Sequence, residues 1–404
     1  MTAVHVPGAL LEVDEACLAA ATRLLDTLGE WPSPVGHRRF REALAAARRA
    51  AGEEEARGAA APLVLRHLRA GWDALEAVVR YRWEWPRVDE RELLAPVAGD
   101  GIVGYATTVL RDAGEEELWA YLEARQGQSE GRLPPGSPAA RRAVQEAADR
   151  LVGAFRAWLR ERGWDLPGLD VEVTLDPSGR ATSSYRPARR VVVLGGAEFL
   201  VFGEEACPRV NPAIALHSLA HELAGHAVHA ALSRDLPAPL RPDDRARLRF
   251  ASLPVSEGFA GYAGRLALSF AREAGDAVGL APGAVGFVEQ VVRLTPVHHA
   301  TAVLLDVAAL RARREPRFDP VSWLESTCGH GGFGEVVAGM ERVPVYKLLY
   351  DAASLAGLRE VEETASRLER RGVEGPAAWR RLGRGAWALA CYREAVLGEG
   401  AGGS

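Results

Sequence analysis

The sequence concentrates histidine in one short segment. Of its ten histidines, four fall within thirteen residues, and a glutamate directly follows the second of the four: His217, His221, Glu222, His226 and His229. Neutral imidazole is the commonest metal ligand among side chains. A helix with the motif H-E-x-x-H directs two imidazoles at one zinc ion and places the glutamate where it can act as a general base. The segment therefore predicts a metal site with a general base beside it.

The two histidines on either side of Glu222 are five residues apart rather than four. In a regular α-helix, residues four apart differ by roughly 40° around the axis and residues five apart by roughly 140°, so His221 and His226 would not converge. One inserted residue, as in a π-helical turn, restores convergence, and Gly225 lies where the backbone could absorb the distortion. Alternatively, His217 and His221, which are four apart, bind the metal without His226. The spacing leaves both arrangements open.

An acidic residue in an otherwise apolar helical stretch is a candidate third ligand. Glu257, in the segment Ser256–Tyr262, follows His226 by 31 residues, and a carboxylate is unfavourable on such a surface unless it is paired or bound to a cation. Two histidines, one glutamate and an open position for water form the ligand set of a catalytic zinc, which lowers the pKa of the water to about 7. We therefore expect Zn²⁺ held by His221, His226 and Glu257, with Glu222 as general base and acid.

The motif H-E-x-x-x-H, followed at this distance by Glu-Gly, resembles the gluzincin metallopeptidases. His221, Glu222, His226 and Glu257 match position by position the pattern of the helical tyrosine carboxypeptidase family, which detyrosinates tubulin. The sequence is also similar to a bacterial peptidase group with H-E-x-x-P-G-H-H and a downstream E-G-W-A-L-Y, although it has one residue fewer before Gly-His and reads E-G-F-A-G-Y. The resemblance covers roughly residues 169–357 and implies a zinc-dependent peptidase that acts on a peptide or protein.

The same resemblance implies further site residues. The strand expected at 191–194 and the following glycine pair would line the cleft, so that Val193 and Gly195 pair with an extended substrate backbone. Such peptidases place a tyrosine or histidine opposite the metal to stabilise the oxyanion of the tetrahedral intermediate, and the candidates are Tyr346, Tyr350 and the pair His298-His299. A carboxypeptidase also needs a group for the terminal carboxylate, for which the candidates near the cleft are Arg293, Arg186, Arg189 and Arg190.

A mainly α-helical scaffold with a small β-sheet before the metal-site helix is expected to position these residues. From about residue 12 to 162, apolar residues recur every three or four positions, as in amphipathic helices. The segment 169–202 favours short strands, and Asn211-Pro212 is a cap-plus-proline start for a helix over 212–232. The expected division is a helical region at 1–136, a catalytic region at 137–397 and a disordered tail at 398–404. The best candidate for a linker is Gln126–Pro138.

Composition narrows the class of protein. The chain has 404 residues and a formal net charge of −5, and Lys347 is the only lysine among its 49 basic residues. Slight acidity, with arginines interleaved among acidic residues, argues against a nucleic-acid partner. No apolar run reaches the roughly 18–20 residues of a membrane span, and the first twenty residues are too acidic for a signal peptide, so a cytoplasmic protein without a membrane partner is expected. The four cysteines are far apart and indicate neither a zinc ribbon nor a disulfide framework.

Two other functions fit the same residues. Two histidines and a carboxylate also bind non-haem Fe(II) in oxygenases, so an Fe(II)- and 2-oxoglutarate-dependent peptide hydroxylase is the first alternative. The second is a non-catalytic relative that binds a peptide or partner protein without cleaving it.

Overall fold

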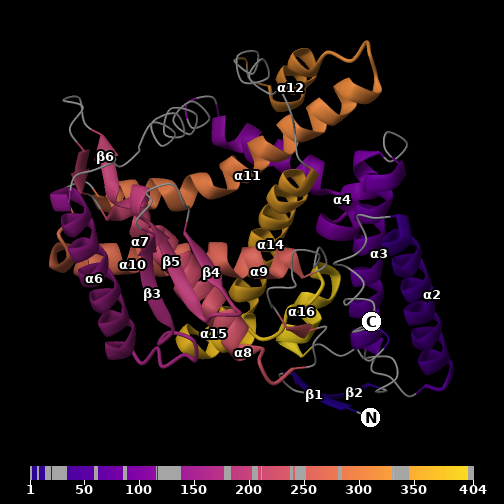
Figure 1. Ribbon diagram of the computed structural model, residues 1–404, viewed down its shortest axis with the longest axis horizontal. Helices are drawn as coiled ribbons and strands as arrows, with labels where there is room; N and C mark the ends of the chain where they lie inside the picture. The colour runs from indigo at the N-terminus through magenta and orange to yellow at the C-terminus, as the bar shows by residue number, and fades with distance from the viewer. Residues whose placement is uncertain are drawn as a thin grey trace.

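The computed structural model is mainly α-helical with a small β-sheet, which confirms the predicted fold class (Figure 1). It describes residues 2–6, 9–13, 20, 34–58, 62–84, 89–114, 116, 138–176, 183–202, 208–210, 212–236, 240–241, 252–280, 284–329, 331 and 345–398. The predicted linker, apart from Pro138, and the predicted tail beyond Gly398 lie outside these residues.

The N-terminal part begins with a β-hairpin that the helical periodicity of the sequence does not predict. Its strands, β1 (Thr2–Val6) and β2 (Ala9–Val13), pair antiparallel. The helices that follow are α2 (Pro34–Ala56), α3 (Pro62–Glu84), α4 (Glu90–Ala98), Ile102–Gly114 and α6 (Pro138–Glu161). Within the described residues no single helix is long and apolar enough to cross a membrane; α4 and Ile102–Gly114 reach that length and composition only as a pair, bent by 82°.

Three short strands form a sheet within the predicted β segment. The spatial order is β3-β5-β4, with β3 parallel and β4 antiparallel to the central strand, and the strands are β3 (Glu172–Asp176), β4 (Ser184–Arg186) and β5 (Val191–Gly195). The central strand is an apolar, largely buried run, as expected for a strand covered on both faces. A 3-10 turn, η1 (Gly196–Phe199), leads to a second antiparallel pair, β6 (Leu200–Phe202) and β7 (Pro208–Val210).

The helix predicted at 212–232 is present and runs without a break from Ala213 to Leu232. Its parts are α7 (Ala213–Leu219), the π-helix η2 (Ala220–Ala227) and α8 (Val228–Leu232). The helices after it are α9 (Leu253–Tyr262), α10 (Gly264–Ala274), α11 (Ala284–Arg314), α12 (Pro320–Cys328), α14 (Val345–Arg370), α15 (Gly375–Leu382) and α16 (Leu389–Leu397), with a 3-10 turn, η5 (Gly275–Val278), after α10.

The N-terminal and C-terminal helices contribute to one continuous hydrophobic core. Polar contacts cross the same junction. His67 in α3 accepts a hydrogen bond from the backbone N–H of Ala388 at 2.9 Å, and Arg311 in α11 donates to the buried Glu90 in α4 at 2.7 Å. The N-terminal helices α3 and α4 therefore pack directly against the C-terminal helices α11, α14 and α16.

Candidate metal centre

The helix that carries the histidine motif changes from α to π at the motif itself. The π-helical segment η2 begins at Ala220 and ends at Ala227, so it includes both histidines of the H-E-x-x-x-H sequence. An i→i+5 turn holds one residue more than an α-turn, so residues five apart return to the same face. The rings of His221 and His226 accordingly lie with centroids 4.9 Å apart. Of the two arrangements left open by the spacing, the structure has the π-helical one.

Gly225 serves helix packing more than local backbone freedom. Its φ is not in the left-handed region, and a Cβ atom at this position would lie 2.5 Å from Cα of Ala260 in α9. Real Cβ atoms do not approach backbone so closely, so η2 and α9 can cross at this distance only with glycine here. The close crossing brings Glu257 of α9 opposite the two histidines.

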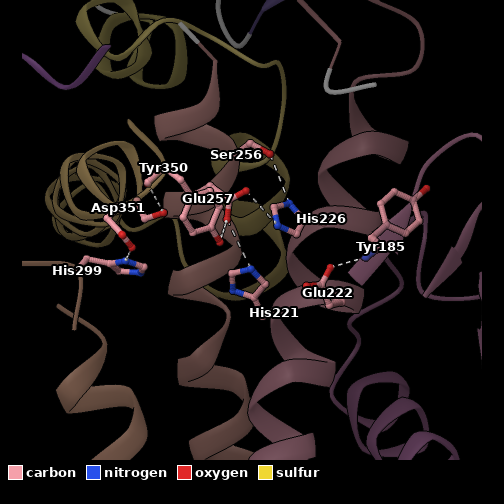
Figure 2. A network of polar contacts seen from close by, with 10 residues as sticks. Tyr185, His221, Glu222, His226, Ser256, Glu257, His299, Tyr350 and Asp351 are labelled. Atoms are coloured by element: carbon pink, nitrogen blue, oxygen red, sulfur yellow. Dashed lines mark hydrogen bonds and ion pairs between the residues drawn. The ribbon is translucent and has the colours of Figure 1, made fainter. Parts of the chain in front are cut away.

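The three predicted ligands converge (Figure 2). One oxygen of the Glu257 carboxylate lies 3.7 Å from Nε2 of His221, and the other lies 3.6 Å from Nε2 of His226. These separations are longer than hydrogen bonds. Two ligand atoms that share a tetrahedral zinc at ~2.0–2.2 Å lie roughly 3.3–3.6 Å apart. The donor set and its spacing therefore fit a zinc ion.

When no metal ion is bound, the positive charge of His226 balances the negative charge of Glu257. Burial lowers the pKa of His221 to about 3, and His226 adds to the effect. Burial also disfavours the charged form of His226, but the Glu257 carboxylate outweighs it and raises the pKa of His226 to about 9. The pKa of Glu257 falls to about 2, because the attraction of His226 exceeds the opposing effect of burial. A metal ion that binds here must therefore displace a proton from His226.

Two hydroxyl groups contact the candidate ligands from outside. Oγ of Ser256 lies 3.4 Å from Nδ1 of His226, and the hydroxyl of Tyr350 in α14 donates to Glu257 at 2.9 Å. Hydrogen bonds of this kind fix the orientation of metal ligands, and their loss typically lowers metal affinity by ~10–100-fold. Tyr350, predicted to stabilise an oxyanion, is thus placed to orient Glu257.

Glu222 lies on the other side of the histidine rings, toward the sheet (Figure 2). Its side chain is buried, and its carboxylate accepts a hydrogen bond of 2.6 Å from the backbone N–H of Tyr185 in β4. Burial raises the pKa of Glu222 to about 7. A carboxyl group with a pKa near neutrality is suited to both accept and return a proton.

A histidine–aspartate pair lies on the side opposite Glu222. Nδ1 of His299 in α11 is 3.0 Å from the carboxylate of Asp351 in α14, and the His299 ring is next to that of Tyr350, with centroids 6.2 Å apart. His298 is adjacent, and the ligand atoms of His298, His299 and Asp351 lie within 4.8 Å of one another. The sequence pattern did not identify Asp351; its only signal is an acidic residue directly after Tyr350 in an apolar helical segment.

The predicted substrate strand lies in the middle of its sheet. Val193 and Gly195 belong to β5, whose two edges are already occupied: Val193 is paired with Thr174 on one side and Ser184 on the other. Gly195 is paired with Asp176, and its N–H donates to the side chain of Ser183. A central strand has no free edge for a substrate backbone, whereas the edge strand β4 lies beside Glu222.

Other predicted residues have different outcomes. Arg293 is on α11 but exposed, and it is not among the described residues that line the cavity beside the metal centre. Tyr346 is in the first turn of α14, and its side chain lies outside what the structure describes, as does His330. Arg186, Arg189 and Arg190 are exposed at the end of β4 and in the turn to β5.

Comparisons with known proteins do not assign a family. No protein-family model and no curated protein matches the chain. Among solved structures, it is similar to the crystal structure of a "putative lipoprotein" from Colwellia psychrerythraea, with 16% sequence identity and a TM-score of 0.45. The similarity covers 80% of this chain and 55% of the Colwellia chain, so this chain spans about half the length of that protein.

Proposed function

We propose that the protein is a zinc-dependent peptidase that resembles the gluzincins. The observation that carries the proposal is the convergence of three side chains: the Glu257 carboxylate oxygens lie 3.7 and 3.6 Å from Nε2 of His221 and His226. A second carboxylate, that of Glu222, lies on the side of the sheet. His221, His226 and Glu257 would hold the metal. Glu222 is excluded from the ligand set because its carboxylate faces the Tyr185 N–H instead.

A zinc ion, when bound, polarises the scissile carbonyl and makes a water molecule more acidic. The protein's own residues then handle the proton. Glu222, with a pKa of about 7, takes a proton from the water as its oxygen attacks the carbonyl carbon. As the C–N bond breaks, Glu222 returns that proton to the departing amine, so that the products are a carboxylate and an amine.

His299 is the group best placed to face the substrate from the other side. Its Nδ1 lies 3.0 Å from the carboxylate of the buried Asp351, a contact that fixes the orientation of the ring. An imidazole N–H next to the reaction centre stabilises the negative charge that develops on the carbonyl oxygen. The contact with Asp351 favours His299 for this role.

The strand β4 positions the general base. It pairs with β5, and the backbone N–H of its residue Tyr185 donates to the carboxylate of Glu222. This hydrogen bond fixes the carboxylate beside the metal centre, where it can take a proton from the attacking water.

Glu222 also favours hydrolysis over the two alternative functions. An oxygenase that binds Fe(II) with the same three residues has no step that needs a buried carboxylate of raised pKa at this position. A protein that only binds peptides has no use for the buried carboxylate of Glu222, and burying this carboxylate would lower its stability. The position and the pKa of Glu222 therefore support peptide hydrolysis as the function.

The test is a comparison of Glu222→Gln with wild type. Purified protein, without added metal, is analysed for bound elements and then incubated with a mixed peptide library, with cleavage products read by mass spectrometry. We expect zinc near one equivalent in both proteins, and cleavage by wild type reduced at least ~10²-fold in the variant. Unchanged cleavage by the variant would contradict the mechanism. Iron at one equivalent, with turnover that depends on 2-oxoglutarate and oxygen, would establish the hydroxylase instead.

A further inference from the structure

A cavity of ≈ 350 Å³ opens beside the metal centre. His221 and Glu257 form part of its wall, and His299 lines it from α11. It is thus continuous with the point where the three ligands meet, on the side away from Glu222. Its size is within the range of ~300–1,000 Å³ that is typical of pockets for small ligands. A substrate bound at the metal would have one side chain next to this space.

The walls of the cavity are mainly apolar. Most of its exposed wall surface is apolar and comes from side chains such as Phe287, Val291, Leu294 and Leu358. The polar lining residues away from the metal ligands are His217, Gln290, Thr295, His298, His299 and Ser354. Among the described residues that line it there is no arginine, lysine or aspartate. Burial in this space would stabilise a large apolar side chain of the substrate, whereas a charged side chain would lose much of its hydration.

Gly261 keeps the cavity open. The neighbouring Gly258 is required by helix packing, because a Cβ atom at this position would lie 2.1 Å from the backbone of Gly357. A Cβ atom on Gly261, by contrast, would meet only Cδ1 of Leu358, at an ordinary distance of 3.6 Å. A helix is less stable with glycine in its interior than with alanine, and helix contacts do not require glycine at position 261. What glycine provides at 261 is space in the cavity wall.

We propose that this cavity is the specificity pocket of the site, that it takes one large apolar or aromatic side chain adjacent to the scissile bond, and that Gly261 sets its size. The inference rests on the proposed function, because the pocket selects substrates only if the metal centre acts on them. In a hydrophobic pocket each methylene changes discrimination by roughly 10–200-fold, so phenylalanine should exceed alanine by at least ~100-fold in kcat/KM.

The first measurement compares pairs of peptides that differ only in Phe or Ala next to the cleaved bond. Gly261→Leu places a side chain in the cavity, and we expect the Phe/Ala ratio of kcat/KM to fall at least tenfold, with Gly261→Ala between the two. The matched control is Gly286→Leu, an exposed position of α11 with open space around it, which should keep the wild-type ratio. Circular dichroism and zinc content show that each variant is folded.

The second measurement needs no turnover. Phenylalanine hydroxamate and alanine hydroxamate are titrated calorimetrically into zinc-loaded Glu222→Gln, with and without Gly261→Leu. We expect the phenylalanine compound to bind at least tenfold more tightly, and Gly261→Leu to remove that difference. Equal affinities of the two compounds would overturn the pocket assignment.

The two measurements separate the two proposals. If wild type cleaves no peptide but the hydroxamate preference is present and is lost in Gly261→Leu, the peptidase function is wrong and the pocket stands. If wild type cleaves peptides without regard to the flanking side chain, the function stands and the pocket is wrong.

Discussion

The buried carboxylate of Glu222 should make the metal-free protein less stable at neutral and alkaline pH. Burial raises the pKa of Glu222 from 4.5 to about 7. A carboxyl group whose pKa is higher in the folded state contributes stability that is complete below pH 4.5 and is lost as the pH rises through about 7. At 1.36 kcal/mol for each pKa unit, the loss amounts to about 3 kcal/mol.

Glu222→Gln removes the charge and keeps an oxygen that can accept from the N–H of Tyr185. We therefore expect the variant to match wild type near pH 4.5 and to be more stable by about 3 kcal/mol at pH 8, with the difference growing between pH 4.5 and 7. The assay is urea unfolding of chelator-treated protein at a series of pH values, followed by circular dichroism. Glu325→Gln, at an exposed position of α12, is the control and should change stability by no more than about 0.5 kcal/mol at any pH.

Two results would refute this reasoning. One is equal stability of wild type and Glu222→Gln at pH 8. The other is a stability difference that is the same at every pH, because that would reflect packing rather than ionisation. The predicted result would mean that the chain keeps an acidic residue that weakens the fold, as functional sites often do.

Three further outcomes are expected. Removal of zinc by a chelator should lower the melting temperature, and zinc but not magnesium should restore it, because two imidazoles suit zinc and magnesium prefers oxygen ligands. Gly225→Ala should lower the free energy of unfolding by about 1–3 kcal/mol, because the added methyl group would overlap Ala260. The control Gly153→Ala lies in open space on α6 and should raise the free energy of unfolding by about 0.5–1 kcal/mol. Urea titrations measure both variants. Tyr350→Phe should weaken zinc binding about 10–100-fold in a competition with a chromogenic chelator, since Glu257 loses its hydroxyl donor.

Features determined by local sequence were predictable. The helix at 212–232, the β segment before it and the candidate ligand Glu257 all follow from periodicity, caps and isolated polar residues in apolar stretches. The choice between the two histidine pairings was not predictable in this way. It depends on the close crossing at Gly225 and Ala260, which are 35 residues apart in the chain and meet only in the folded protein.

Strand order is a property that the sequence pattern does not provide. The family resemblance implies Val193 and Gly195 as substrate-binding residues, but strand order decides which edge of a sheet is available. A five-residue apolar run such as Val191–Gly195 is typical of a buried central strand, and this signal favours a neighbour as the edge. The neighbour, Ser184–Arg186, is too short and too polar to be recognised as a strand by pattern.

The contact between Gly258 and Gly357 determines which parts of the site can move. A Cβ atom on Gly357 would overlap the carbonyl of Pro254, so the backbones of α9 and α14 touch over about one helical turn. Such a pair cannot slide or separate without opening a void in the core, and Glu257, Tyr350 and Asp351 therefore move as one rigid unit. Any motion that admits a substrate or releases a product must take place at the boundaries of this unit, such as its contact with α11.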